Sequence, residues 1–450
     1  MSQARASRNP VPWRWGLSVA VAGLILTGCA ALPEPDGMEA AIIARTEGLE
    51  ALAPAEGSGA RSVARNGLLL DPAVREAASL VSASADEVRV QRAALFPGLG
   101  LSVGGGVGSA GEGKAAAELQ GSQLLFDGGN SKRSVKLADF DMQISYLTFQ
   151  KEVDEALITV LQAYDDVQMK VDLLKVYRKQ LDALGELETL VAARAKKGAV
   201  SSTDVLETRR RVQSAVFLVN DTELALAEAR DRLALLSGQS TGGRIAISGT
   251  SCNAGGESDD LRLARLELGR ARMALEKAQN ALDPRVVLQP IVRAEIGTGK
   301  VPVGLNLDIQ SDLLKGGALS AKANAARNKL AAAQARLDSV GREDTLEERG
   351  LLRSIAAGDQ KRNLLQRQIS LLSQTRELYR SQYFDLGTRQ LSELLDNEEE
   401  FYARKAELAE LESQLAIDRM KCVARSRNLR KKLGLEGQSI YGYPLASDLI

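Results

Sequence analysis

The chain has 450 residues, enough for several ordinary domains, but aromatic residues make up only 4% of it, which suits long helices better than a globular core. Lys and Arg balance Asp and Glu at 58 each, so charge gives no basis for nucleic-acid binding. The chain has no histidine, the commonest general base and metal ligand. We therefore expect no enzyme, no catalytic residue, no metal and no cofactor.

The N-terminus has the features of a bacterial lipoprotein signal. A basic segment precedes an apolar core at residues 16–25, which is too short to span a bilayer as a permanent helix. The core ends in Leu26-Thr27-Gly28-Cys29, which is similar to a lipobox. We predict a signal peptide at residues 1–28, lipidation of Cys29, and a flexible tether over residues 29–60. The alternative is a plain signal peptide that happens to contain a cysteine.

The rest of the chain is a tandem duplication. Three landmark pairs recur at offsets of 187, 188 and 189 residues: Pro97 with Pro284, Gly128 with Gly316, and Gly198 with Gly387. Such regular spacing predicts two structural repeats, at residues 61–240 and 259–434. A connection at residues 241–258 joins them, and a tail at residues 435–450 follows.

Each repeat is expected to begin with a helix that ends before a proline, at residues 72–95 and 259–281. A strand pair follows each helix, at residues 99–126 and 285–310. In residues 286–296 and 301–309, apolar side chains alternate with polar or small ones, a pattern typical of transmembrane hairpins. A hairpin of a soluble sandwich is the alternative, but no other segment could supply the second sheet.

Two hairpins provide four strands, which cannot close a barrel. Open sheet edges in lipid leave amide groups without partners, so membrane insertion would require several chains. Two chains would give eight strands, and a barrel of about eight strands is filled by its own side chains. A conduit therefore needs at least three chains.

The second half of each repeat is a long helical hairpin. We expect helices at about residues 130–197 and 202–236, and again at 318–386 and 391–433. Val160, Val167, Leu174 and Leu181 recur every seven residues, the spacing of a coiled-coil seam. At ~1.5 Å per residue, the first of these helices would be about 100 Å long.

These features together resemble the TolC-like outer-membrane efflux protein family over essentially the whole mature chain. The resemblance is carried by Ala93-Ala94-Leu95-Phe96-Pro97 before the first strand, Gln123-Leu124-Leu125-Phe126-Asp127-Gly128-Gly129 after the second, and the two glycine tips. Residues 383–398 are most similar to the branch of the family that serves type I secretion.

The resemblance implies a fold that is mostly α with membrane β-hairpins. Specifically, it implies a TolC-like homotrimeric α/β-barrel channel, lipid-anchored in the outer membrane and extending into the periplasm. It also implies two partners, a periplasmic adaptor (a membrane fusion protein) and an inner-membrane ABC or proton-driven transporter.

The resemblance further assigns a periplasmic tip and gate to six residues: Gly198, Thr203, Asp204, Gly387, Thr388 and Arg389. Arg389 matches the basic residue that ties neighbouring coiled coils closed, and Glu393 and Asp396 match acidic rings that line the constriction. Glu393 stands where aspartate is more common, and Lys315 replaces the aspartate of the second Phe-Asp-Gly-Gly-like site. The alternative is that Asp204 and Arg389 are ordinary solvated loop charges.

Two cysteines remain after Cys29. Cys422 lies 35 residues beyond Gly387, and Cys252 lies shortly beyond the end of the equivalent helix of the first repeat. The two could sit at the same height along the rod, so we predict a disulfide between them in the oxidising periplasm. Two free thiols are the alternative.

The function that these features predict is a passive exit duct for type I, ABC transporter-driven protein secretion. The alternative within the class is the outer-membrane component of a multidrug or metal efflux pump. A lipid-anchored periplasmic adaptor or structural rod is the alternative from another class.

Overall fold

The structure is a computed structural model that describes residues 35–107, 113–246, 257–296, 301–311 and 316–446. The signal peptide, Cys29, Cys252 and Lys315 lie outside these residues. The chain divides into two compact units. Unit 1 comprises Met1–Ala40, Ser82–Met142 and Glu267–Ala333, and unit 2 comprises Ala41–Val81, Gln143–Leu266 and Gln334–Ile450.

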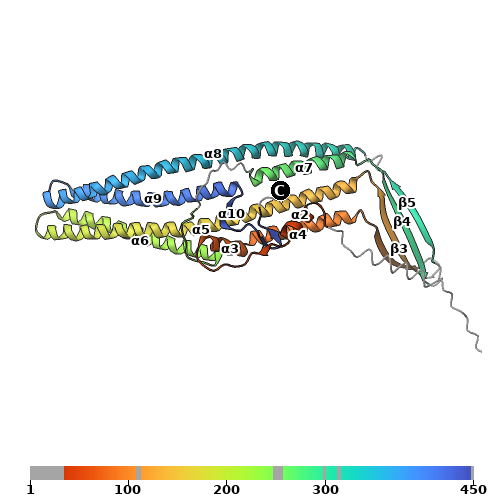
Figure 1. Ribbon diagram of the computed structural model, residues 1–450, viewed down its shortest axis with the longest axis horizontal. Helices are drawn as coiled ribbons and strands as arrows, with labels where there is room; N and C mark the ends of the chain where they lie inside the picture. The colour runs from red at the N-terminus through yellow and green to blue at the C-terminus, as the bar shows by residue number, and fades with distance from the viewer. Residues whose placement is uncertain (1–34, 108–112, 247–256, 297–300, 312–315, 447–450) are drawn as a thin grey trace, which may run out of the picture. The chain divides into compact units, whose positions relative to one another are not determined.

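Unit 1 contains a four-stranded antiparallel sheet in the order β2-β3-β4-β5 (Figure 1). Its strands are β2 (Gly98–Val107), β3 (Gly113–Phe126), β4 (Arg285–Ile296) and β5 (Val303–Gln310). Both predicted hairpins are therefore confirmed. Pairing between β3 and β4 joins the hairpin of the first repeat to that of the second.

The register of the sheet separates apolar from polar side chains. Leu101, Leu119, Val292 and Val303 occupy one row across the four strands. In the next row, Ser102, Glu118 and Arg293 occupy paired positions on β2, β3 and β4. Because side chains alternate along a strand, the two rows lie on opposite faces. One face of the sheet is therefore apolar, and the other is largely polar or made of small residues.

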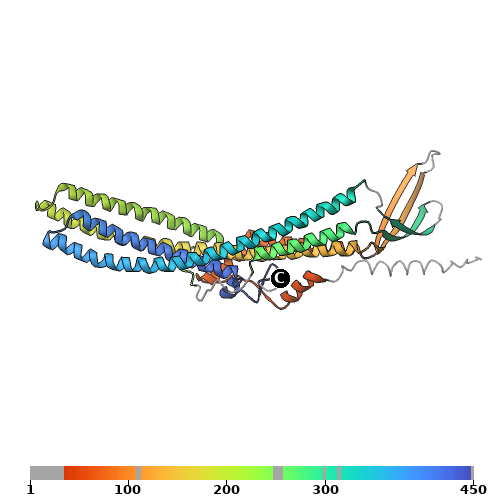
Figure 2. The same cartoon turned by 90° about the horizontal axis from the view of Figure 1, so that it is seen from above.

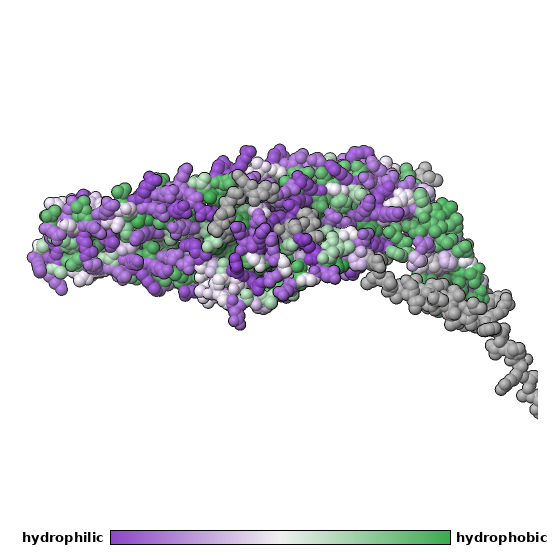
Figure 3. Space-filling model, viewed as in Figure 1, coloured by the Kyte–Doolittle hydropathy of each residue, from purple (hydrophilic) through white to green (hydrophobic). Residues whose placement is uncertain are grey.

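Much of the apolar face is not covered by any other described residue. Val303 is 75% exposed and Leu101 is 71% exposed, and Val103, Leu305, Leu307 and Ile309 are also more than half exposed. Figure 3 shows hydrophobic residues gathered over the strands. An exposed apolar surface of this kind marks a contact with lipid or another protein.

The strand-to-helix junction of the first repeat, between β3 and α5, touches the helix-to-strand junction of the second, between α7 and β4, in unit 1. Asp127 accepts hydrogen bonds from the backbone N–H groups of Gly129 (2.9 Å) and Ser131 (2.6 Å), and so caps the next helix. Gly128 has a φ of +63°, and a Cβ on it would come within 2.0 Å of the Asp283 carboxylate. Only glycine tolerates both the positive φ and the close approach of Asp283 at this position.

The long helices also lie close to their predicted bounds, apart from the C-terminal end of α9. In the first repeat, α4 spans Pro72–Ala93, α5 spans Asn130–Lys196 and α6 spans Ser202–Ser237. In the second, α7 spans Asp259–Gln279, α8 spans Ala318–Ser381 and α9 spans Leu391–Arg425. A five-residue π-helix, Gln382–Leu386, continues α8 to its tip. No helix in the described part of the chain is long and apolar enough to cross a membrane.

The returning helix of the second repeat is shorter than predicted. It ends at Arg425, and a separate helix, α10 (Leu429–Leu433), follows a turn in which Arg427 has a φ of +57°. The break orients Arg430, which is fully buried and bonds both carboxylate oxygens of Asp154 on α5, at 2.9 and 2.8 Å. A buried bidentate ion pair thus fixes the end of this repeat.

The predicted tether contains regular structure, which corrects that prediction. Helix α2 (Gly37–Thr46) buries Met38 and Ile42, and β1 (Glu50–Ala51) and α3 (Ala60–Leu70) follow it. The tail is also ordered: β6 (Gln438–Ile440) pairs with β1 and with β7 (Tyr443–Pro444). These small elements depend on tertiary contacts, which proline and glycine content does not reveal.

Candidate functional site

The two glycine tips end the descending helices in the same way. Gly198 and Gly387 have φ values of +73° and +65°, the left-handed conformation that ends a helix. At the first tip, the N–H of Ala199 bonds the carbonyl of Arg194 at 3.0 Å. At the second, the N–H of Thr388 bonds the carbonyl of Gln382 at 3.0 Å, across the π-helix. π-Helices are frequent at functional sites.

An apolar cluster in unit 2 holds both tips together. It joins Leu184, Leu187 and Val191 of α5 and Ala215 of α6 to residues of the second hairpin: Tyr383, Leu391, Leu394 and Leu395. The three α5 residues, together with Leu394 and Leu395, have no exposed surface. From the sequence alone, the two tips belong to separate hairpins. Contacts within this cluster hold the two hairpins together, and the tips therefore lie side by side.

At the first tip, Asp204 caps its own helix. The Ser201 hydroxyl accepts a bond from the N–H of Asp204, and the Asp204 carboxylate accepts one from the N–H of Ser201, both at 3.1 Å. This reciprocal pair is a capping box. Thr203, also predicted for the gate, is exposed beside it. Asp204 therefore stabilises the start of α6 within one chain.

At the second tip, Arg389 folds back on its own hairpin. It donates to Glu393 at 2.9 Å and to Gln382 at 3.1 Å, and its guanidinium lies 4.0 Å from the centre of the Tyr379 ring. Thr388 is exposed. Arg389 and Asp204 each bond groups of their own hairpin, and these bonds do not link the two residues within one chain. A bond between them would therefore have to form between two copies of the chain.

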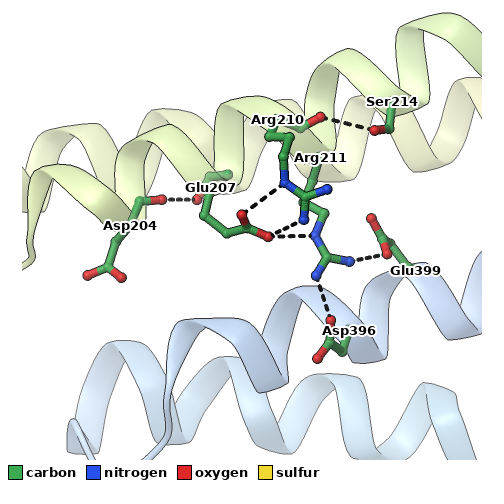
Figure 4. Close-up of polar contacts among 8 residues, drawn as sticks. Asp204, Glu207, Arg210, Arg211, Ser214, Asp396 and Glu399 are labelled. Atoms are coloured by element: carbon green, nitrogen blue, oxygen red, sulfur yellow. Dashed lines mark hydrogen bonds and ion pairs between the residues drawn. The ribbon is translucent and has the colours of Figure 1, made fainter.

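The site's main ionic contact joins α6 to α9 and was not predicted (Figure 4). Arg211 of α6 donates to Asp396 of α9 at 2.8 Å, pairs with Glu399 of α9, and bonds Glu207 of its own helix at 2.9 Å. We call Arg211, Asp396, Glu399 and Glu207 the Arg211 clamp. The Arg211 side chain is only 16% exposed, so water screens its contacts less than those of an open surface pair.

The clamp changes the interpretation of the predicted acidic rings. Asp396 is paired with Arg211, and Glu393 is paired with Arg389. Both carboxylates therefore have a positive partner within the chain. Asp396 and Arg211 lie 185 residues apart, so neither periodicity nor local spacing connects them.

The charged groups in and beside the clamp also shift one another's pKa values. Hydrogen bonds from Arg210 and then Arg211 lower the pKa of Glu207 to about 2. Burial alone would lower the pKa of Arg211, but bonds and charges from Glu207, Glu399 and Asp396 outweigh it and raise that pKa. Glu207 and Arg211 are therefore both ionised at neutral pH.

A second unpredicted arginine joins α5 to the π-helix. Arg194 donates to the carbonyl oxygens of Tyr383 (3.0 Å) and Phe384 (3.4 Å), and its guanidinium faces both rings, at 5.2 and 5.7 Å. It supplies donors to carbonyls near a helix C-terminus, where positive charge is favourable. The only signal in the sequence was a basic residue in the last turn of α5.

The remaining site predictions concern cysteines and metals. Cys422 is 1% exposed and disulfide-bonded. Its predicted partner, Cys252, lies outside the described residues, so their pairing stays a prediction. In the described part of the chain, no group of histidine, cysteine, aspartate or glutamate side chains is arranged to hold a metal ion.

Residues 64–239 match the family model for outer membrane efflux proteins. Three solved structures are similar in fold. The Campylobacter jejuni CmeC outer membrane channel is 12% identical, with a TM-score of 0.73 and coverage of 87% of both chains. VceC from Vibrio cholerae is 16% identical, with a TM-score of 0.74 and coverage of 83% of this chain and 96% of that one. The open state of the Neisseria gonorrhoeae MtrE outer membrane channel is 16% identical, with a TM-score of 0.69 and coverage of 90% and 98%.

No curated protein matches the chain in sequence. The fold similarity spans nearly the full length of the solved channels, while the family match falls on the first repeat. Together they confirm the resemblance to the TolC-like outer membrane efflux protein family, whose fold this chain has.

Proposed function

We propose that this chain is the outer-membrane exit duct of a tripartite export system and acts as a homotrimer. The observation that carries the proposal is the four-stranded sheet with an exposed apolar face. Its edge strands, β2 and β5, each pair with one neighbour among the described residues. In lipid those edges require partners, and three copies would supply twelve strands, enough to surround a pore.

The helices support the same function. α5 has 67 residues, so at ~1.5 Å per residue it is about 100 Å long, a length suited to crossing the periplasm. The duct would be passive, with energy supplied by an inner-membrane ABC or proton-driven transporter through a periplasmic adaptor. Lipidation of Cys29 would add an anchor in the outer membrane.

Type I protein secretion is the leading cargo class, because residues 383–398 carry the tip sequence that resembles that branch. Multidrug or metal efflux is the second candidate, favoured by the efflux family match over residues 64–239. Deleting the gene separates the two. Loss of one secreted protein from the medium supports secretion, whereas increased sensitivity to drugs or metals with secretion intact supports efflux.

We propose that the tips form the gate. The Arg211 clamp would hold the two hairpins of one chain together, and Arg389 would reach Asp204 and Thr203 of a neighbouring copy when the tips close. Glu393 and Asp396 would then line the constriction as paired charges. Opening would have to separate these partners, which is harder at a partly desolvated site than on an open surface.

The Arg389 part of the gate has a direct test. Arg389→Ala removes its bonds to Glu393 and Gln382 and any bond to a neighbouring copy. The variant should conduct more current in planar bilayers than the wild type. Arg367→Ala, an exposed change on α8 away from the tip, is the matched control. Equal conductance of the wild type and the Arg389 variant would exclude Arg389 from the gate.

A further inference from the structure

The polar face of the four-stranded sheet carries acidic and basic side chains in balance. Among the strand residues whose side chains the structure describes, four are charged, two of each sign: Glu118, Asp308, Arg285 and Arg293. All four lie on the face opposite to the row of Leu101 and Val303. The other two charged residues of these strands, Lys114 and Glu295, are also one of each sign.

Glu118 and Arg293 form an opposite pair at the end of the sheet farther from the helices that its strands join. They are direct partners in the antiparallel ladder between β3 and β4. Directly opposite residues in such a ladder have Cβ atoms about 4.5–5.5 Å apart. β2 contributes the uncharged Ser102 to the same row. We call Glu118 and Arg293 the outer pair.

Arg285 and Asp308 form a second opposite pair at the other end of the same face. The ladder partner of Arg285 is Gln310, which donates a hydrogen bond to Asp308 at 2.8 Å. Asp308 is therefore a diagonal neighbour of Arg285, at a separation of roughly 7–8 Å. We call these two residues the inner pair. Arg285 and Arg293 are eight residues apart on β4, so at ~3.3 Å per residue the two pairs are separated by about 26 Å.

In the proposed duct the polar face lines the lumen, because lipid covers the apolar face. A passage lined by charges of one sign attracts solutes of the other sign and repels those of its own. We infer that Glu118 and Arg293 determine the charge selectivity of the outer end of the duct, and that their mutual cancellation admits cargo of either charge. Such an opening suits polypeptides, whose charge changes sign along the chain. The inference deepens the proposed function and rests on it for the orientation of the sheet in the membrane.

A cysteine at Gln120 can report the potential beside the outer pair. Gln120 is exposed on the polar face, two residues from Glu118 along β3 and diagonal to Arg293. Its partner on β2 is Gly100, which leaves room for a reagent. The purified full-length Gln120→Cys protein, reconstituted in phosphatidylcholine vesicles, is treated with a cationic and, separately, an anionic methanethiosulfonate reagent. The ratio of the cationic to the anionic rate should be close to that of free N-acetylcysteine, and protein without the new cysteine controls for the native ones.

Removing one charge of the outer pair should change this ratio. With Glu118→Gln, the arginine is left without its opposite charge, so the ratio should fall by about twofold or more in 0.1 M salt. With Arg293→Gln, the ratio should rise by a similar factor. The double variant should return to the ratio of Gln120→Cys alone. In 1 M salt, where the Debye length is about 3 Å, the differences should largely disappear.

Arg285→Gln is the matched control for Arg293→Gln. It makes the same change on the same face of the same strand, but Arg285 lies six residues from Ile291, the ladder partner of Gln120. That distance is about 20 Å, or two Debye lengths in 0.1 M salt. The ratio at Gln120→Cys should therefore not change. An effect as large as that of Arg293→Gln would overturn the assignment of selectivity to the outer pair.

Leu119→Cys separates the inference from the proposed function. Leu119 neighbours Gln120 but lies on the apolar face, so in lipid its thiol should react much more slowly with both reagents. If only Gln120→Cys reacts quickly and neither Glu118→Gln nor Arg293→Gln changes its ratio, the inference is wrong and the proposed function stands. If both thiols react equally fast, or neither reacts, the polar face does not line an aqueous lumen within lipid. Either result would overturn the proposed function together with the inference.

Discussion

At the scale of single residues, the tips are held by arginines that each satisfy several acceptors. Arg211 bonds three carboxylates on two helices, and Arg194 bonds two carbonyl oxygens while facing two rings. The planar guanidinium suits both roles, because it has five N–H donors and a flat face. Lysine at either position would keep the charge but lose most of the contacts.

Arg211→Met should loosen the contact between α6 and α9. The change leaves Asp396 and Glu399 without their shared partner, a cost of about 1–2 kcal/mol for partly exposed charges. Hydrogen exchange near residues 205–215 and 391–400 should become faster. Arg210→Met is the matched control, because Arg210 is exposed and its side chain bonds Glu207 of its own helix rather than α9. Equal exchange in both variants would mean that the clamp does not hold the hairpins.

The clamp should also weaken in acid. The pKa of Glu207 is lowered from 4.5 to about 2, so its contribution is present above about pH 4.5 and is lost as pH falls toward 2. Conductance in bilayers should be constant from pH 7 to about 4.5 and rise below that. In Glu207→Gln, conductance should already be raised at pH 7. If Glu207→Gln has the same conductance as the wild type at pH 7, Glu207 does not help the clamp to hold the gate closed.

Arg430 should contribute more than Arg211 to the free energy of unfolding. Arg430→Met leaves the Asp154 carboxylate buried without its partner, which costs about 3–5 kcal/mol. Thermal unfolding should therefore begin at a markedly lower temperature, and the chain after residue 426 should become sensitive to proteases. Lys431→Met, at the exposed neighbouring position, should change neither property. Unfolding temperatures that agree between the two variants would refute the role of Arg430.

At the scale of elements, the sequence predicted the strands and long helices because their signals are local. Alternation identified β4 and β5, and the absence of proline from residues 130–197 identified α5. The break between α9 and α10 was missed because it depends on Asp154, 276 residues from Arg430. Helix α2 was missed for a similar reason, since its N-terminus bonds Asp139 of α5. Both tip glycines were found, but the Arg211 clamp required spatial information.

The left-handed turn at the first tip can be tested by substituting its glycine. Gly198 has a φ of +73° and open space where a Cβ would stand, so Gly198→Ala should destabilise by about 1 kcal/mol through backbone strain alone. Gly185 lies inside α5 with equally open surroundings, so Gly185→Ala should stabilise by up to ~1 kcal/mol. Thermal unfolding should show shifts of opposite sign. Shifts of the same sign would contradict the left-handed turn.

At the scale of the whole molecule, one chain leaves three kinds of surface without a partner among its described residues. These are the sheet edges, the apolar sheet face, and the exposed apolar side chains of α6 and α8, such as Phe217 and Leu371. Lipid would cover the sheet face, and further copies would cover the edges and the exposed side chains of these helices. A single arrangement of three copies accounts for all of them, which is why the oligomer is the centre of the proposed function.

Single-channel recording in planar bilayers tests that proposal most directly, using the purified full-length protein with its trimer verified by native mass spectrometry. The trimer should insert and give discrete conductance steps, and Arg389→Ala should give larger ones. A lipid-anchored adaptor or structural rod would give none. A verified trimer that inserts into the bilayer and conducts no current, in either the wild type or the Arg389 variant, would contradict the exit duct.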